Sequence, residues 1–153
     1  MNPDILTPQT PTEVPITTPS FYASETLCPD STLSHVFRSS TSEPIPLLQD
    51  RISCLRQAGT ILQASFNSRV LDLVSGAEGS AGKLVNLLAK HFPCFDDRAR
   101  FDGREVRIMK RAQIFVADLW AKFEGVGYGG FGDVEGVTMF AGELTLNPVC
   151  LLL

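Results

Sequence analysis

The feature that most constrains this chain is a helical pattern that gives way to a run of glycines. Between residues 107 and 141, apolar side chains recur every three or four positions, as on the buried face of an amphipathic helix. Six glycines then fall within the twelve residues from Gly125 to Gly136, where they end the helix and disfavour another. The sequence therefore predicts a helix followed by a glycine-rich loop. The predicted apolar stripe consists of Ile108, Ala112, Phe115, Leu119 and Phe123.

Two ionisable residues, Lys110 and Asp118, lie on the same predicted helix away from its apolar stripe. Eight residues at about 1.5 Å each separate them by roughly 12 Å along the axis. This distance is too long for a salt bridge, but it suits contacts with the two ends of one small ligand.

Length and charge limit the class of protein. A chain of 153 residues is long enough for one domain with a modest core. Its 13 basic and 17 acidic residues give a net charge of −4, which argues against a general affinity for nucleic acid. A basic cluster between residues 98 and 111 can bind one phosphate group, or it can be an ordinary solvated surface.

Neither a metal site nor a membrane segment is expected. The four cysteines are scattered without a C-x-x-C pair, and the chain has only two histidines. No signal peptide pattern and no apolar run of membrane-spanning length occur. These observations predict a cytoplasmic protein without a metal or another cofactor.

The amino-terminal third is broken up by proline, since eight of the ten prolines precede residue 47. Residues 1–20 are predicted to be a disordered tail rich in proline and threonine. Phe21 and Tyr22 follow as core anchors or as walls of a ligand pocket. A short helix after Pro29 is predicted to be capped by Asp30 or Ser31.

Further helices are predicted over residues 47–66 and from the cap Ser80 to about His91. The adjacent carboxylates Asp96 and Asp97 are predicted to cap a helix rather than to act in catalysis. The segment 104–108 alternates in polarity but has no evident partner strand, so we interpret it as a helix lead-in. The prediction is an all-α domain of four or five helices.

Several motifs in one order make the chain resemble the queuosine salvage protein family, the queuosine 5′-phosphate N-glycosylases. Earlier stretches of residues 21–141 are also similar, including Phe92-Pro-x-Phe95-Asp-Asp97. The main motifs are Lys110-Arg-Ala-Gln-Ile114, Asp118-Leu-Trp120, Phe123-Glu-Gly125, Phe131-Gly-Asp133 and Val137-Thr-Met-Phe-Ala141.

The resemblance implies a helical fold similar to part of a DNA glycosylase. It also implies hydrolysis of the N-glycosidic bond of queuosine 5′-phosphate, a small nucleotide, which releases queuine for transfer RNA modification. A carboxylate beside the sugar would stabilise the oxocarbenium-like transition state or direct a water molecule. Aromatic rings would hold the flat base, and a basic residue would hold the phosphate.

On this resemblance, Lys110 is expected at the phosphate or the sugar. Asp118 is expected to face the ligand or orient Lys110, or else only to act as a cap or to pair with Arg111. Asp133 is expected to contact the base or close the pocket, so Asp118 and Asp133 are the candidate catalytic residues. Trp120 and Phe140 are expected to be pocket walls or, alternatively, simple core residues.

The chain departs from the family after Ala141, because Gly142 stands where the family has an aspartate that is a candidate catalytic residue. We therefore expect a partial family domain over residues 21–141, followed by a non-family tail over 142–153, and a truncated chain of doubtful activity. A non-catalytic helical module that binds a ligand or partner is the alternative. Direct binding to transfer RNA is a third and less favoured hypothesis, because of the acidic net charge.

Overall fold

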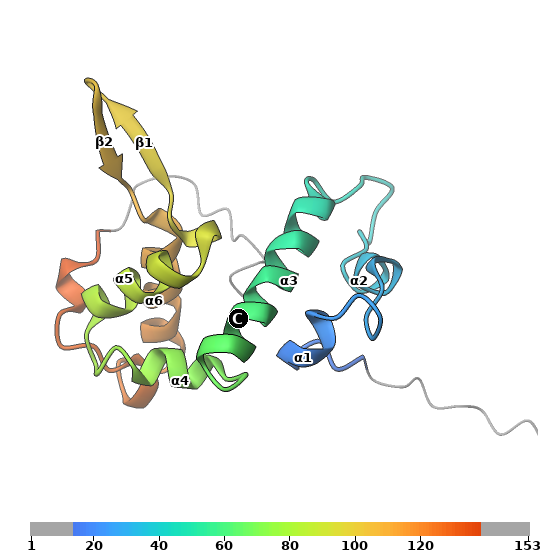
Figure 1. The fold of residues 1–153 in the computed structure, drawn as a ribbon. Helices are drawn as coiled ribbons and strands as arrows, with labels where there is room; N and C mark the ends of the chain where they lie inside the picture. The colour runs from blue at the N-terminus through green and yellow to red at the C-terminus, as the bar shows by residue number, and fades with distance from the viewer. Residues whose placement is uncertain (1–13, 139–153) are drawn as a thin grey trace, which may run out of the picture.

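The structure is a computed structural model that describes residues 14–138. The 18-residue helix α3 (Leu48–Ser65) is the longest helix of the described residues. It connects an amino-terminal group of short helices to a larger carboxyl-terminal group of helices (Figure 1). The other helices are α1 (Pro19–Tyr22), α2 (Asp30–Val36), α4 (Val70–Ser75), α5 (Ala81–His91) and α6 (Lys110–Lys122). The 3₁₀ turns are η1 (Pro93–Phe95), η2 (Gly127–Gly129) and η3 (Val134–Gly136), and the strands are β1 (Arg98–Phe101) and β2 (Arg104–Arg107).

The first half of α3 packs against α1 and α2. A small hydrophobic cluster forms there from Tyr22, Cys28, Leu33, Ile52 and Leu55. The Tyr22 ring lies against α3 at Gly59, where a Cβ atom would come within 2.6 Å of the ring. The glycine therefore permits close packing of α1, which outweighs its poor helix propensity. Tyr22 is a core residue, as one of the two sequence interpretations proposed.

Arg56 of α3 forms hydrogen bonds that hold the segment containing α1 and α2 against α3. Its guanidinium donates hydrogen bonds to the carbonyl oxygens of Tyr22 at 3.1 Å and Cys28 at 2.8 Å, and it also pairs with Asp30. The Arg56 side chain is only 12% exposed. Loss of this side chain would leave two carbonyl groups without their donor.

We expect Arg56→Ala to lower the free energy of unfolding by about 2 kcal/mol, because charged donors to buried acceptors contribute about that much. Arg56→Lys should recover only part of the loss, since one ammonium cannot reproduce the planar fork. Urea denaturation followed by circular dichroism would measure both variants. The matched control is Arg69→Ala, which breaks an exposed 3.6 Å pair with Asp72 and should change stability by less than about 0.5 kcal/mol. Equal losses of stability in Arg56→Ala and Arg69→Ala would contradict the stabilising role of the Arg56 hydrogen bonds.

The second half of α3 belongs to the main core, with α4, α5 and α6. Four phenylalanine rings run through this core in sequence, namely Phe66, Phe92, Phe95 and Phe115, with successive ring centroids 6.0–6.1 Å apart. Leu84 and Leu88 of α5 are fully buried in the same cluster. The core thus fixes α5 beside α6, and these two helices carry most of the candidate site.

A two-stranded antiparallel hairpin projects from the helical body, so the prediction of a helix lead-in over residues 104–108 is wrong (Figure 1). Phe101 pairs with Arg104, which leaves Asp102 and Gly103 as a two-residue turn. Both turn residues have positive φ, 48° and 72°, as a type I′ turn requires. The protein is therefore mostly helical with a small sheet, rather than strictly all-α.

The main helix predictions are confirmed, with local corrections. Helix α3 occupies the predicted span 47–66 to within one residue at each end, and Ser80 caps α5 by accepting a hydrogen bond from the Lys83 amide. The N-cap of α2 is Pro29, which has no side-chain acceptor, so the prediction of Asp30 or Ser31 as the cap is wrong. Of the expected tail 1–20, residues 14–20 are described, and Pro19 already begins α1.

Candidate functional site

A pocket of about 320 Å³ lies between α5, α6 and η3, and we name it the Gln113 pocket. Polar groups reach it from three segments that are distant in sequence. Such a combination of a small cavity with a few polar groups is typical of a ligand site. Its lining residues are Gly82, Val85, Asn86, Gln113, Asp133, Gly136, Val137 and Thr138.

Gln113 is held at both ends of its amide group. Its nitrogen donates to the carbonyl oxygen of Ile108 at 3.1 Å. Its oxygen accepts from the Thr138 amide at 2.9 Å and from the Thr138 hydroxyl at 2.8 Å. These bonds attach residue 138 to α6 and close one side of the pocket. In the sequence, Gln113 was noted only as part of the motif from Lys110 to Ile114 and was not assigned a role, although its amide lies one turn after Lys110 on the predicted helix.

Asp133 ties the glycine-rich segment to the amino end of α5. Its carboxylate oxygens accept hydrogen bonds from the Ser80 hydroxyl at 2.8 Å, the Ala81 amide at 2.6 Å and the Gly82 amide at 3.2 Å. The Ser80 bond, followed by the two amide bonds, holds the pKa of Asp133 below its ordinary value. An anion at a helix amino terminus is also favoured by the helix dipole.

The depressed pKa predicts a specific loss of stability in acid. The folded-state pKa of Asp133 lies below the unfolded-state value of about 3.9. The charged carboxylate therefore contributes fully to the stability of the fold above the unfolded-state pKa. This contribution is lost as the pH falls through the folded-state pKa. We expect Asp133→Asn to lower Tm by about 3–6 °C at pH 7, and the gap from the wild type to narrow below pH 4.

Thermal unfolding between pH 2.5 and pH 7 would test this expectation. Glu135→Gln is the matched control, since Glu135 lies in the adjacent turn η3 and accepts none of the three bonds. Its Tm curve should follow the wild type throughout. A Tm difference between Asp133→Asn and the wild type that stays constant with pH would show that ionisation of Asp133 does not contribute to stability.

Lys110 and Asp118 both lie on α6 and are exposed, as the sequence predicted. At 100° per residue they lie about 80° apart around the helix, so they share one broad solvent-facing side. Lys110 is one turn before Gln113 on α6, and it is not among the residues that line the Gln113 pocket. No ion pair to Arg111 is found for Asp118 among residues 14–138; Arg111 instead donates to the carbonyl oxygen of Cys94 at 2.9 Å.

Trp120 lies near the end of α6 and is 45% exposed, so it is not a core residue in the described part of the chain. A Cβ atom at Gly125 would come within 3.1 Å of the Trp120 Nε1 atom, which explains the need for glycine beside the ring. Phe123 is also partly exposed and packs edge-on against Tyr128, with ring centroids 6.1 Å apart. Phe140 lies outside the described residues.

The predicted site residues are therefore only partly brought together. Asp133 lines the Gln113 pocket, whereas Lys110, Asp118 and Trp120 line neither this pocket nor a second one of about 360 Å³. The second pocket lies between α4 and the glycine-rich segment, and its lining includes Ser75 and Tyr128.

Asp97 caps α6 from a distance, since its carboxylate accepts from the Lys110 amide at 3.0 Å. The expected capping role is therefore confirmed for Asp97 alone, and the helix that it caps is α6, because strand β1 follows directly in the chain. Asp96 pairs instead with Arg98 at 2.7 Å and lies 3.6 Å from Arg107. Within residues 14–138, no group of three or more potential metal ligands converges, and no helix has the length and apolarity needed to cross a membrane.

Comparisons with known proteins identify the family. The queuosine salvage protein model matches residues 5–147. The queuosine 5′-phosphate N-glycosylase/hydrolase of Schizosaccharomyces pombe is 44% identical over 128 residues, which cover 84% of this chain and 37% of that relative. The Bos taurus protein of the same name is 41% identical with the same coverage. One from Sphaerobacter thermophilus is 42% identical over 97 residues, covering 63% of this chain and 30% of the relative.

The aligned part thus spans less than two fifths of each of these relatives. Within this chain, however, the match extends over nearly all described elements, from α1 to η3. The chain belongs to the queuosine salvage protein family.

Proposed function

We propose that this chain binds queuosine 5′-phosphate and hydrolyses its N-glycosidic bond, releasing queuine for transfer RNA modification. The observation that carries the proposal is the 44% identity over 84% of the chain to a protein named for this activity. We further propose a cytoplasmic location and a fold related to part of a DNA glycosylase.

Lys110 binds the 5′-phosphate in this proposal. It is exposed at the first turn of α6, and no carboxylate within residues 14–138 pairs with it. The Lys110 amide at the amino terminus of α6 already donates to the Asp97 carboxylate, so the Lys110 ammonium group is the phosphate-binding group in this proposal. The Gln113 pocket, at about 320 Å³, lies one turn further along α6 and is not assigned to the ribose, because Asp118 does not line it.

Asp118 lies two turns further along α6, and we assign its carboxylate to the sugar. Positive charge develops on the ribose as the bond to the base breaks, and a nearby carboxylate stabilises it or directs the attacking water. Trp120 and Phe140 serve as walls against the flat base. Asp133 already accepts three hydrogen bonds from α5, so we assign it to positioning of the glycine-rich loop beside the substrate.

A phosphate-specific effect at Lys110 tests the proposal. We expect Lys110→Ala to reduce kcat/KM for queuosine 5′-phosphate by about 10–100-fold, the effect of one charge-assisted hydrogen bond. The loss for unphosphorylated queuosine should be smaller than about threefold. Chromatographic measurement of released queuine would follow both reactions. Lys122→Ala, which removes an exposed lysine at the other end of the same helix, should alter neither. Equal losses on both substrates would remove the phosphate assignment.

A non-catalytic binding module is the second candidate. It is favoured by the exposure of Lys110, Asp118 and Trp120, because hydrolysis of this kind profits from a site that excludes water. Calorimetric titration with queuosine 5′-phosphate, alongside the queuine assay, separates the two functions. Binding without release supports the module, and release at a rate above that of the Asp118→Asn variant supports the hydrolase.

A further inference from the structure

Charge is distributed very unevenly along this chain. Residues 98–111 contain six basic and two acidic residues, a net charge of +4, whereas the whole chain carries −4 and the remaining residues therefore −8. The net charge argues against a general affinity for nucleic acid, but a local positive surface can still bind nucleic acid. Most of this basic segment is the hairpin β1–β2, which projects from the helical body (Figure 1).

One face of the hairpin carries only charged residues, and the other carries three apolar residues and one arginine. Residues directly opposite each other in an antiparallel pair share a face, and successive residues alternate. The register therefore places Arg98, Arg100, Glu105 and Arg107 on one face. The other face carries Ala99, Phe101, Arg104 and Val106. All eight residues are exposed, so within residues 14–138 neither face is covered.

Two of the four arginines are already neutralised at the base of the hairpin. Arg98 pairs with Asp96 and Glu105, both at 2.7 Å, and Arg107 lies 3.6 Å from Asp96. These contacts lower the pKa of Asp96, chiefly through its hydrogen bond to Arg98. These ion pairs hold the base of the hairpin in place and neutralise the positive charges of Arg98 and Arg107.

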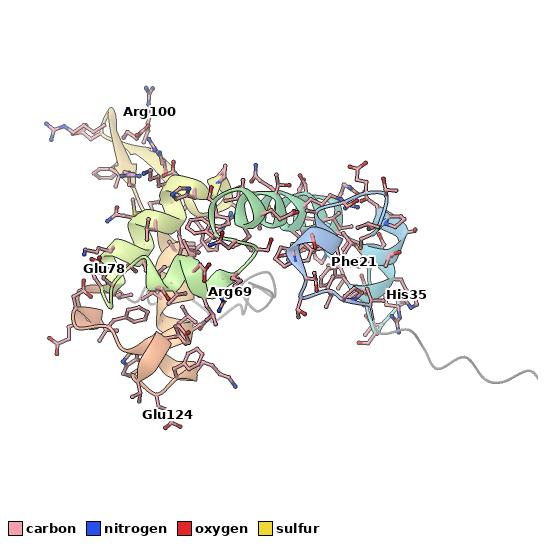
Figure 2. The ribbon with its side chains drawn as sticks, turned by 60° about the horizontal axis from the view of Figure 1, so that its bottom comes forward. Phe21, His35, Arg69, Glu78, Arg100 and Glu124 are labelled. Carbon is pink, nitrogen blue, oxygen red and sulfur yellow. The ribbon has the colours of Figure 1, made fainter. Side chains whose placement is uncertain are left out.

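The other two arginines remain available at the tip. Arg100 and Arg104 have no carboxylate within 4.0 Å among the described residues. Figure 2 shows the Arg100 side chain extending outward from the end of the hairpin. Phe101 lies next to Arg100 in the chain, is paired with Arg104 across the turn, and is 77% exposed. The tip thus combines two free guanidinium groups with one bare aromatic ring.

We propose that the hairpin tip binds single-stranded RNA. A base stacks on Phe101, and Arg100 and Arg104 bind the phosphates on either side. Asp102 in the turn offers an acceptor for a ribose 2′-hydroxyl, which DNA lacks and which distinguishes the two nucleic acids. An acidic peptide would satisfy the arginines but would leave the exposed ring without a flat partner, so RNA fits both features better.

Fluorescence anisotropy with a labelled 12-nucleotide oligouridylate and the full chain tests this proposal. We expect a Kd of about 10–100 μM at low salt, typical of sequence-independent contacts. With two phosphates neutralised, log K should fall against log salt with a slope of about −1.4. Arg100→Ala combined with Arg104→Ala should abolish most of that slope. Lys90→Ala combined with Lys122→Ala removes equal charge outside the hairpin and should leave binding unchanged.

Substitutions at Phe101 separate stacking from simple charge attraction. Phe101→Leu should weaken binding about 5–100-fold, whereas Phe101→Trp should retain or strengthen it, because only an aromatic ring stacks on a base. Both variants keep the residue apolar, and an unchanged Tm would show that the fold is intact. A loss of equal size in the two variants would overturn the stacking contact.

Competitor ligands test the identity of the partner. A matched DNA oligonucleotide should bind at least about threefold more weakly than the RNA, since it lacks the 2′-hydroxyl. A 12-residue oligoglutamate should compete poorly. Competition by oligoglutamate as strong as that by RNA, equal affinity for DNA and RNA, or no RNA binding at all would each overturn the proposal. None of the residues that we assign to queuosine 5′-phosphate lies on the hairpin, so the two proposals can fail separately.

Discussion

Replacement of Phe92 by alanine is expected to lower the free energy of unfolding by about 3–5 kcal/mol, the usual cost of emptying a buried aromatic site. Phe92 is 1% exposed and follows the last turn of α5. Its ring stacks on Phe66 and packs edge-on against Phe95, both at 6.1 Å. The variant therefore leaves a cavity where α3, α5 and η1 meet. Since small domains are stable by about 5–15 kcal/mol, this single change removes a large part of the total.

Urea denaturation followed by circular dichroism would measure the effect. Phe101→Ala provides a matched control, because it removes the same side chain from a position that is 77% exposed. That variant should remain within about 0.5 kcal/mol of the wild type. A similar loss in both variants, or a loss below about 1 kcal/mol for Phe92→Ala, would contradict the placement of Phe92 in the main core.

The helices were predictable where two local signals agree. Helix α5 has an apolar stripe at helical spacing and a serine cap, and both signals fall within one short window of sequence. The predicted set of buried residues on α6 was only partly correct. Ala112 and Phe115 are buried as predicted, but Val116 is buried as well, and Phe123 lies past the helix end and is 39% exposed. A stripe read at fixed intervals does not locate the point where a helix stops.

The hairpin was missed because its first strand, residues 98–101, was not recognised as a partner for the alternating segment 104–108. Both strands are exposed along their whole length, so alternation between core and solvent, the usual signal of a strand, is absent. Turn chemistry was the better guide. Asp102-Gly103 is one of the strongest two-residue hairpin signals, and it lies between two segments of equal length. The segment 98–101 was therefore the partner strand that the sequence reasoning did not find.

The candidate site was harder to predict than the helices, because its contacts are distant in sequence. Asp133 meets Ser80 across 53 positions, and Thr138 meets Gln113 across 25. Local periodicity carries no information about such contacts, which arise only when α5 and α6 pack together. The residue types were informative nonetheless. Ser80 and Asp133 were each singled out from the sequence, although their mutual contact was not.

Asp118→Asn is expected to reduce kcat/KM for queuosine 5′-phosphate by at least about 100-fold, the usual effect of losing a catalytic carboxylate. The same variant should leave Tm unchanged, because Asp118 is exposed on α6 and forms no hydrogen bond or ion pair found within residues 14–138. Released queuine and thermal unfolding, measured on one preparation, give the two quantities together. Ala117→Gly would weaken the same helix turn without touching a carboxylate, and it serves as the control for purely structural loss.

The contrast with Asp133→Asn makes this test decisive between the two candidate carboxylates. Asp133 accepts three hydrogen bonds at the start of α5, so its loss should lower Tm, while kcat/KM of the folded protein falls by less than about tenfold. The opposite result, an inactive Asp133→Asn with an unchanged Tm and an active Asp118→Asn, would move the catalytic role to Asp133. A carboxylate that is fully hydrogen-bonded to backbone amides is a poor base, since those bonds stabilise its charged form. For proton abstraction from the attacking water we therefore propose Asp118, for which no hydrogen bond or ion pair is found within residues 14–138.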